Sequence, residues 1–177
     1  MEREKSMGQE MKEHRIVEQV PWSETCFGCN GGPNEGIGMR AFITEDGYVV
    51  GRCRVKAGHQ GFPDTVHGGI IATYFDEVLW HATRVDDPDL LAMTVEMTTR
   101  YQKRIPVGEE LRVVARPAVF DGRHVRVEGY ILLSDDTVAA TASVHYITVR
   151  QEHVFNKTEN ARVKYQGDAR ELGSIRF

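Results

Sequence analysis

A histidine and two glycines precede an apolar segment that carries two acids, and these residues best suit catalysis by type and spacing. His67-Gly68-Gly69 stands directly before residues 70–84, which lack Gly and Pro and repeat apolar side chains at helical spacing. The first N–H groups of a helix lack internal partners and carry partial positive charge. Because Gly68 and Gly69 have no side chain, a ligand oxygen can approach these donors, as an oxyanion requires.

The acids lie about two turns further along the predicted helix. A carboxylate is costly to bury, so an acid on an apolar helix indicates a functional role. Asp76 is therefore the candidate general base or nucleophile. Glu77 points about 100° away around the helix axis. We interpret Glu77 as an exposed or structurally paired acid.

Strand-like segments on both sides of this helix predict the architecture. Residues 37–45 and 48–56 flank Asp46-Gly47, which is a strong hairpin signal. After the helix the apolar period changes to two, over 94–101, 110–120, 125–133 and 138–145. We therefore expect an α+β fold, in which about six antiparallel strands wrap around one long central helix. One helix covers only one sheet face, so we expect the other face to meet a partner.

The domain organisation is predicted from composition. The charged segments 1–21 and 151–177 are interpreted as extensions, the first forming a helix or fraying, and 22–150 as the folded domain. The N-terminus lacks the apolar stretch of a secretory signal, so we expect a cytoplasmic protein.

Charge and hydropathy exclude several function classes. The 177 residues include 22 Lys and Arg against 26 Asp and Glu, a net charge of −4. This balance argues against a nucleic-acid partner, which usually meets a basic face. No apolar run approaches the roughly 20 residues that span a bilayer, so we expect no membrane partner.

The three cysteines are too few for a disulfide scaffold. Cys26 and Cys29 form a Cys-x-x-Cys pair, but a structural zinc needs four ligands and the sequence has no second Cys pair. Residues 30–33 read as a loop, whereas a redox pair should open a helix. The spacing of the histidines does not indicate ligands. We therefore expect no metal and no cofactor, and packing beneath a loop for these thiols.

The sequence resembles the hotdog-fold acyl-CoA thioesterases of the PaaI-like type, which are related to the 4-hydroxybenzoyl-CoA thioesterases. Three segments carry the resemblance: HGGIIATYFDE at 67–77, LAMTVEMTTRYQKRIPVGEEL at 91–111 and CFGCNGGPNEGIGM at 26–39. The resemblance covers about 22–150. It implies hydrolysis of an acyl-CoA by a homodimer, further assembled into a homotetramer, with each site built from two subunits.

The resemblance also implies roles for particular residues. The catalytic carboxylate falls on Asp76 and the oxyanion donor on the backbone of Gly68. The loop-shaping histidine falls on His67, and a hydroxyl that holds the attacking water falls on Thr94. Many relatives carry Asn or Gln six residues before this histidine, where the present sequence has Gly61.

Further residues are candidates for substrate binding. Beside Gly61, the neighbouring Gln60 or His59 could supply the polar contact, and Gly69 could admit the thioester. Arg100 and Lys103 suit the phosphates of CoA. For each of these two cations the alternative is a solvated strand edge.

Two other functions remain open at this stage. A non-catalytic acyl-CoA-binding protein would have the same fold. A hotdog enoyl-CoA hydratase would use an acid and a histidine, and Asp76 and His81 have an Asp-x4-His spacing. The hydratase pattern, however, places its residues around an Asn-Pro loop, which is absent here.

Overall fold

The computed structural model describes residues 11–23, 25–30, 36–150, 163–164 and 173–177. Most of the predicted extensions, and residues 31–35 of the 26–39 segment, therefore lie outside the described residues. Within these ranges, no helix has the length and apolar character needed to cross a membrane.

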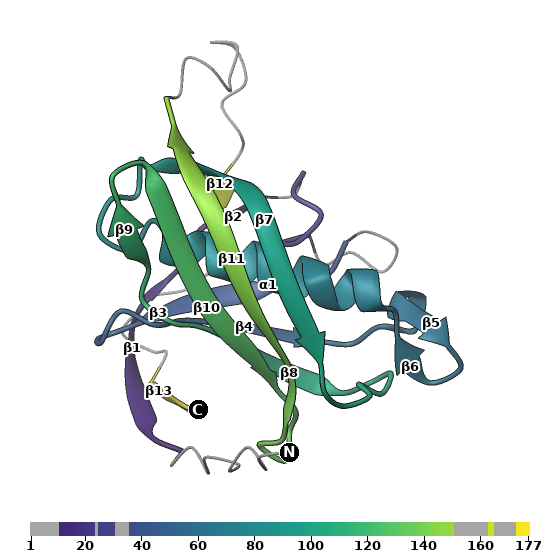
Figure 1. The fold of residues 1–177 in the computed structure, drawn as a ribbon. Coiled ribbons are helices and arrows are strands. Elements are labelled where there is room, and N and C mark those ends of the chain that lie inside the picture. Colours follow the sequence, from purple (N-terminus) through teal and green to yellow (C-terminus); the bar gives the residue numbers. More distant parts are fainter. Residues whose placement is uncertain (1–10, 24, 31–35, 151–162, 165–172) are drawn as a thin grey trace, which may run out of the picture.

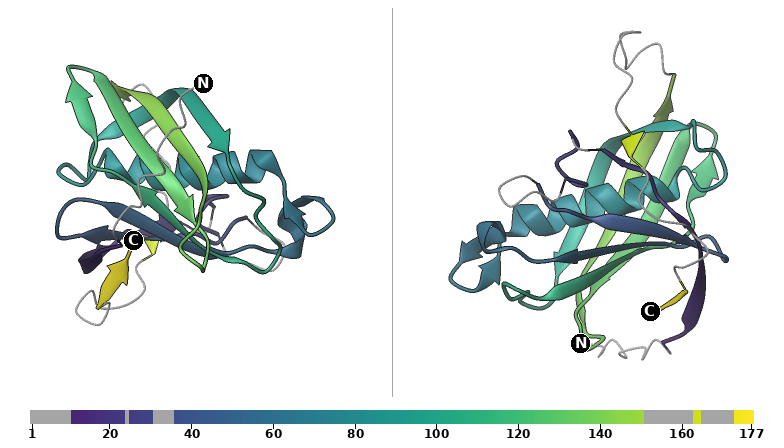
Figure 2. Two further views of the ribbon diagram at one scale, coloured as in Figure 1. Left: turned by 60° about the horizontal axis from the view of Figure 1, so that its bottom comes forward. Right: turned by 180° about the vertical axis from the view of Figure 1, so that it is seen from behind.

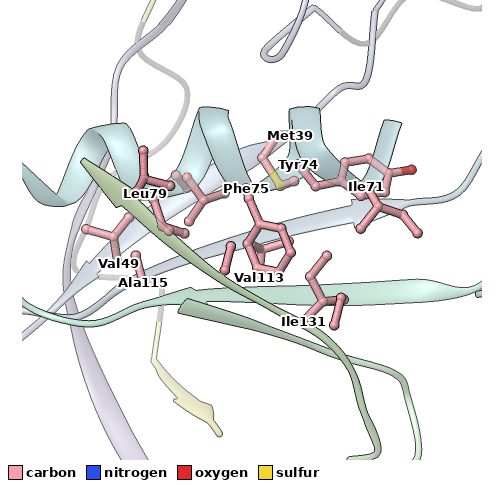
Figure 3. Packing of buried hydrophobic residues seen from close by; sticks show 14 of the residues in the cluster. Met39, Val49, Ile71, Tyr74, Phe75, Leu79, Val113, Ala115 and Ile131 are labelled. Atoms are coloured by element: carbon pink, nitrogen blue, oxygen red, sulfur yellow. The ribbon is translucent and has the colours of Figure 1, made fainter. Parts of the chain in front are cut away.

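The single long helix of the described chain, α1 (Gly68–Ala82), packs along the concave side of a curved sheet (Figures 1 and 2). Its apolar stripe is buried, as Figure 3 shows for Ile71, Tyr74, Phe75 and Leu79. The helix starts two residues earlier than the apolar pattern suggests, because His67 caps it. The imidazole of His67 accepts a hydrogen bond from the Gly69 N–H, a partner that the apolar pattern does not reveal.

The described strands form one large sheet and two small pairs. The large sheet has nine strands in the order β13-β1-β3-β4-β8-β10-β11-β7, with β9 also paired to β10. All of its pairings are antiparallel. The strands of this sheet are β1 (Glu13–Gln19), β3 (Arg40–Thr44), β4 (Val49–Arg54), β7 (Leu91–Tyr101), β8 (Glu110–Ala115), β9 (Val119–Asp121), β10 (His124–Leu132), β11 (Val138–Val149) and β13 (Ser174–Arg176). The small pairs are β2 (Trp22–Ser23) with β12 (Val163–Lys164) and β5 (Gln60–Phe62) with β6 (Thr65–Val66).

The observed sheet is larger than the six strands expected, for two reasons. The predicted strand over 110–120 is interrupted, and Pro117, which has no N–H to donate, lies between β8 and β9. In addition, the segments interpreted as extensions contribute β1 and β13, which continue the sheet beyond β3. The described part of 1–20 is therefore a strand, where a helix or a frayed end was expected.

Two glycines let α1 approach the sheet closely. A Cβ at Gly51 would lie 2.3 Å from Val78 Cγ2. A Cβ at Gly129 would lie 2.7 Å from Leu79 Cδ1 and 2.5 Å from the backbone oxygen of Val114. Real side chains do not tolerate such contacts, so the position of the helix depends on glycine in β4 and β10.

We predict that Gly129→Ala destabilises the protein by about 1–3 kcal/mol, because the added methyl group overpacks the interface between helix and sheet. Gly58→Ala is the matched control, since a Cβ at Gly58 meets no atom within 4 Å. Urea unfolding of the two variants measures the difference. Equal free energies of unfolding would contradict this description of the core.

Candidate active site

A buried histidine, His59, anchors the loop before α1. His59, at the end of the short 3₁₀ helix η1 (Ala57–His59), accepts a hydrogen bond from the His67 N–H at its carbonyl oxygen, 2.9 Å away. Its Nδ1 lies 2.9 Å from the hydroxyl of Tyr74, and burial lowers the pKa of the imidazole. His59 thus holds the loop against the helix. Gln60 is exposed, and its side-chain oxygen accepts from the Asp64 N–H at 3.3 Å.

The hydrogen bonds at the start of α1 distinguish the two glycines. Gly69 donates its N–H to His67 Nδ1 at 2.9 Å. Ile70 and Ile71 donate theirs to the carbonyl oxygen of His67. The N–H of Gly68 has no acceptor among the described residues. Gly68 therefore supplies the free donor at the positive end of the helix, and His67 is the cap that shapes the turn.

Tyr101, which the sequence analysis did not select, also lies at the start of the helix. Its hydroxyl donates to the Gly68 carbonyl oxygen at 3.2 Å, and its ring lies 3.7 Å from the position of a Cβ at Gly68. Tyr101 is the last residue of β7 and is 56% exposed. Only the register of β7 beside α1 reveals this contact.

Asp76 lies further along α1 and is hydrogen bonded to β7. It is exposed, so the burial cost for which the sequence analysis singled it out does not arise. Thr94 Oγ1 donates to Asp76 Oδ1 at 2.9 Å. The strict alternation expected for β7 would turn Thr94 away from the face that carries Tyr101. A register shift at Val95 changes this, because Glu96 pairs with His145 and Thr94 with Tyr146. The bulge thus brings Thr94 and Tyr101 onto the helix-facing side of one strand.

The spacing of Gly68 and Asp76 limits what one chain can do. Eight residues separate them, which corresponds to about 12 Å along the helix axis. A thioester carbonyl can join an oxyanion donor and an attacking carboxylate that are at most about 7 Å apart, or about 10 Å with an intervening water. Within one chain the two groups are too far apart to act on the same carbonyl.

Glu77 points to a different part of the molecule from Asp76. Its carboxylate lies among the thiols of Cys26 and Cys29 and the imidazole of His81. Burial alone would raise the pKa of the Glu77 carboxyl, but the hydrogen bond and charge of His81, with the two thiols, hold it below its ordinary value. Among the described residues, Cys26, Cys29 and Glu77 have ligand atoms close enough together to hold a metal ion, all within 4.8 Å of one another.

The position of His81 bears on the hydratase alternative. His81 is five residues after Asp76, about 140° around the helix, and its Nε2 lies 3.5 Å from Glu77 Oε1. Asp76 is instead bonded to Thr94. The structure therefore does not bring Asp76 and His81 together as an acid–base pair.

The remaining candidates are dispersed. Gly61 packs against His67, since a Cβ at Gly61 would lie 3.0 Å from the His67 ring. Lys103 is exposed beyond the end of β7. Arg100 pairs with Thr141 on the face of the sheet opposite α1, where it lines a pocket of about 260 Å³. The structure does not bring Arg100 to Asp76 or Gly68 of the same chain, and its role in CoA binding stays a prediction.

Comparison with known proteins shows what the chain resembles. Residues 64–140 match the family model of the thioesterase superfamily. This match includes Gly68, Asp76 and Thr94, and the predicted resemblance to PaaI-like hotdog thioesterases is confirmed. A search of the curated proteins found no match to the chain.

Solved structures share the fold. A thioesterase superfamily protein is 28% identical with a TM-score of 0.57, and the alignment covers 62% of this chain and 53% of that protein. The Escherichia coli PaaI protein from the phenylacetic acid degradation operon is 16% identical with a TM-score of 0.58, over 64% of this chain and 81% of its own. A Streptococcus mutans protein bound to acetyl-CoA is 20% identical with a TM-score of 0.51, over 66% and 90%. The predicted α+β hotdog fold is thereby confirmed.

Proposed function

We propose that this protein is an acyl-CoA thioesterase, which hydrolyses an acyl-CoA to the free acid and CoA. The observation that carries the proposal is the hydrogen bond from Thr94 to Asp76, because it orients an exposed carboxylate on a helix that begins with a free N–H. The superfamily match supports a thioester substrate. The acetyl-CoA bound to the structural neighbour from Streptococcus mutans supports CoA as the carrier.

The two groups divide the chemistry between them. The thioester carbonyl oxygen accepts a hydrogen bond from the Gly68 N–H, which stabilises the developing oxyanion by about 3 kcal/mol. Asp76 then either attacks the carbonyl carbon, giving a mixed anhydride that water hydrolyses, or removes a proton from an attacking water. In both routes the C–S bond breaks, the CoA sulfur gains a proton and the acyl group gains the oxygen of water.

Because the two groups are too far apart within one chain, we place each active site between two copies. The outer edge of β7 supports this arrangement. This strand of 11 residues ends the sheet order, and no other described strand pairs with its second edge. Its side chains Met93 and Val95 are 50% and 58% exposed, as expected for an edge that pairs with another chain.

Pairing of β7 with its own copy also predicts a register. Along β7, Thr94 lies beside Asp76 and Tyr101 lies beside Gly68, because each pair is hydrogen bonded. Because the bulge makes Val95 and Glu96 count as one position, an antiparallel pair centred on Thr98 sets Thr94 of one chain opposite Tyr101 of the other. Directly opposed residues have Cβ atoms about 5 Å apart. In this register Asp76 of each copy lies near the Gly68 N–H of the other copy, so each dimer has two equivalent sites.

Release of free thiol from a panel of acyl-CoAs tests the proposal and defines the acyl group. The panel runs from short to long aliphatic chains and includes phenylacetyl- and benzoyl-CoA. We expect hydrolysis of at least one member. The absence of hydrolysis across the panel, with acyl-CoA binding retained, would favour a non-catalytic binding protein.

Asp76→Asn is expected to lower kcat by roughly 10²–10⁴-fold, because the amide can neither attack the carbonyl nor accept a proton. Binding of a non-hydrolysable thioether analogue, measured by calorimetry, should be retained. Asp89→Asn, at an exposed acid beyond the end of α1, is the matched control and should hydrolyse the substrate at the wild-type rate. An Asp76→Asn variant with wild-type turnover would overturn the assignment.

Gly68→Pro removes the proposed oxyanion donor and nothing else that α1 needs. Proline is favoured at the first position of a helix, and His67 already has the extended backbone, with ψ 136°, that precedes proline. We expect kcat to fall by about 10²–10³-fold.

Gly68→Ala is the matched control for this variant, because it keeps the N–H and places its Cβ in ordinary contact with Tyr101, at 3.7 Å. This variant should retain most of the activity. If both variants have equal activity and melt at the wild-type temperature, the Gly68 N–H is not the donor.

A further inference from the structure

Four side chains that commonly bind zinc converge on the side of α1 that carries Glu77. The turn Cys26-Phe27-Gly28-Cys29 directs both sulfur atoms at the Glu77 carboxylate. Cys29 Sγ lies 2.8 Å from Oε1 and Cys26 Sγ lies 3.5 Å from Oε2. One helical turn after Glu77, His81 Nε2 lies 3.5 Å from Oε1. The ligand atoms of the two cysteines and the glutamate all lie within 4.8 Å of one another.

The turn is shaped to hold these groups. The Asn30 N–H donates to the Cys26 carbonyl oxygen at 2.9 Å and closes the turn. The Cys29 N–H points at Cys26 Sγ, 3.4 Å away, and such a donor favours the thiolate form in which cysteine binds metals. Gly28 lies directly over the carboxylate, since a Cβ there would come within 2.0 Å of Glu77 Oε2. Residue 28 therefore has to be glycine while Glu77 points into this turn.

Burial separates this cluster from an ordinary surface network. Cys29 and His81 are 6% and 8% exposed, and Glu77 is enclosed between them. A buried carboxylate beside two thiols loses its hydration. The weak S–H hydrogen bonds that replace the water offset only part of this free-energy cost. A bound cation would satisfy all four groups at once.

The ligand atoms of Cys26, Cys29 and Glu77 are spaced close to those around a tetrahedral ion, whereas His81 contacts only Glu77 and would have to move toward the sulfur atoms to become the fourth ligand. With Zn–S of about 2.3 Å and Zn–N or Zn–O of about 2.1 Å, neighbouring ligand atoms lie about 3.4–3.7 Å apart. Two of the three distances from Glu77 are 3.5 Å, and the third is a hydrogen-bond length that a small rotation of the Cys29 side chain would lengthen. The thiolates favour zinc over magnesium or calcium.

We propose that Cys26, Cys29, Glu77 and His81 bind one Zn²⁺ ion. Two thiols lose their protons to solvent on binding, and no electron is transferred. The ion joins the turn at 26–29 to α1 at Glu77. This residue follows Asp76 directly and points about 100° away from it around the helix axis. With all four coordination positions filled by protein, it is a structural zinc that holds the helix and the N-terminal segment together.

The zinc content of the full-length protein, purified under reducing conditions and freed of excess metal, tests this proposal. We expect about one zinc per chain in the wild type and in Cys53→Ser, which alters the third cysteine, outside the cluster. The double variant Cys26→Ser, Cys29→Ser should hold none. Co²⁺ in place of zinc should give a thiolate-to-metal charge-transfer band in the wild type and in Cys53→Ser, but not in the double variant.

Two further measurements address coordination without depending on the double variant. His81→Asn should weaken zinc binding by roughly 100-fold or more, since even changes around a metal's ligands cost 10- to 100-fold. In the wild type, chelation of zinc should expose two more thiols to a thiol reagent and lower Tm. The proposal is overturned if the wild type binds no zinc, if the double variant binds as much zinc as the wild type, or if mass spectrometry finds a Cys26–Cys29 disulfide in zinc-treated protein.

Discussion

The fixed rise of α1 is the constraint on which the rest of the structure depends. The donor at Gly68 must be at the first position of the helix, because only there is a backbone N–H left free. The carboxylate at Asp76 must be two turns away, where Thr94 can reach it from β7. About 12 Å of rigid helix lies between them, and no side-chain rotation removes this distance. The proposed mechanism therefore needs a second chain, and we propose that it pairs with the edge strand β7.

The same helix serves two purposes because its sides face different neighbours. The stripe with Tyr74 and Phe75 packs on the sheet (Figure 3). Asp76 turns toward β7, whereas Glu77, the next residue, turns toward Cys26 and Cys29. A zinc ion held at Glu77 would fix the rotation of α1 about its axis. That rotation is what directs the Asp76 carboxylate at the β7 edge.

The sequence analysis predicted the α+β fold and the helix well, because periodic burial and the Asp46-Gly47 turn are local signals. It missed β1 and β13, whose residues are as polar as loops and are held by pairing at a sheet edge. It selected Thr94 through the family resemblance, while strict alternation would have turned that residue away. The bulge at Val95 that corrects this depends on pairing with β11, which a single strand does not encode.

The cluster of Cys26, Cys29, Glu77 and His81 was not predicted from sequence, for a similar reason. Counting cysteines found two ligands, and nothing local connects Cys29 with Glu77, which lies 48 residues later. Glu77 was interpreted as an exposed or paired acid, and the structure shows it paired, with Cys29 and His81. Arg100 was chosen for its charge alone. The pairing of β7 with β11 sets it on the face opposite α1.

Activity in mixtures of two inactive variants tests most directly whether each site combines Gly68 of one chain with Asp76 of another. Gly68→Pro and Asp76→Asn chains are unfolded together, refolded and assayed for thioester hydrolysis. In a mixed dimer one site then receives both intact groups and the other receives neither, so random pairing restores about one quarter of the wild-type activity. If both groups of a site came from one chain, every site would carry a substitution. The mixture would then be as inactive as its parents, which would contradict the account.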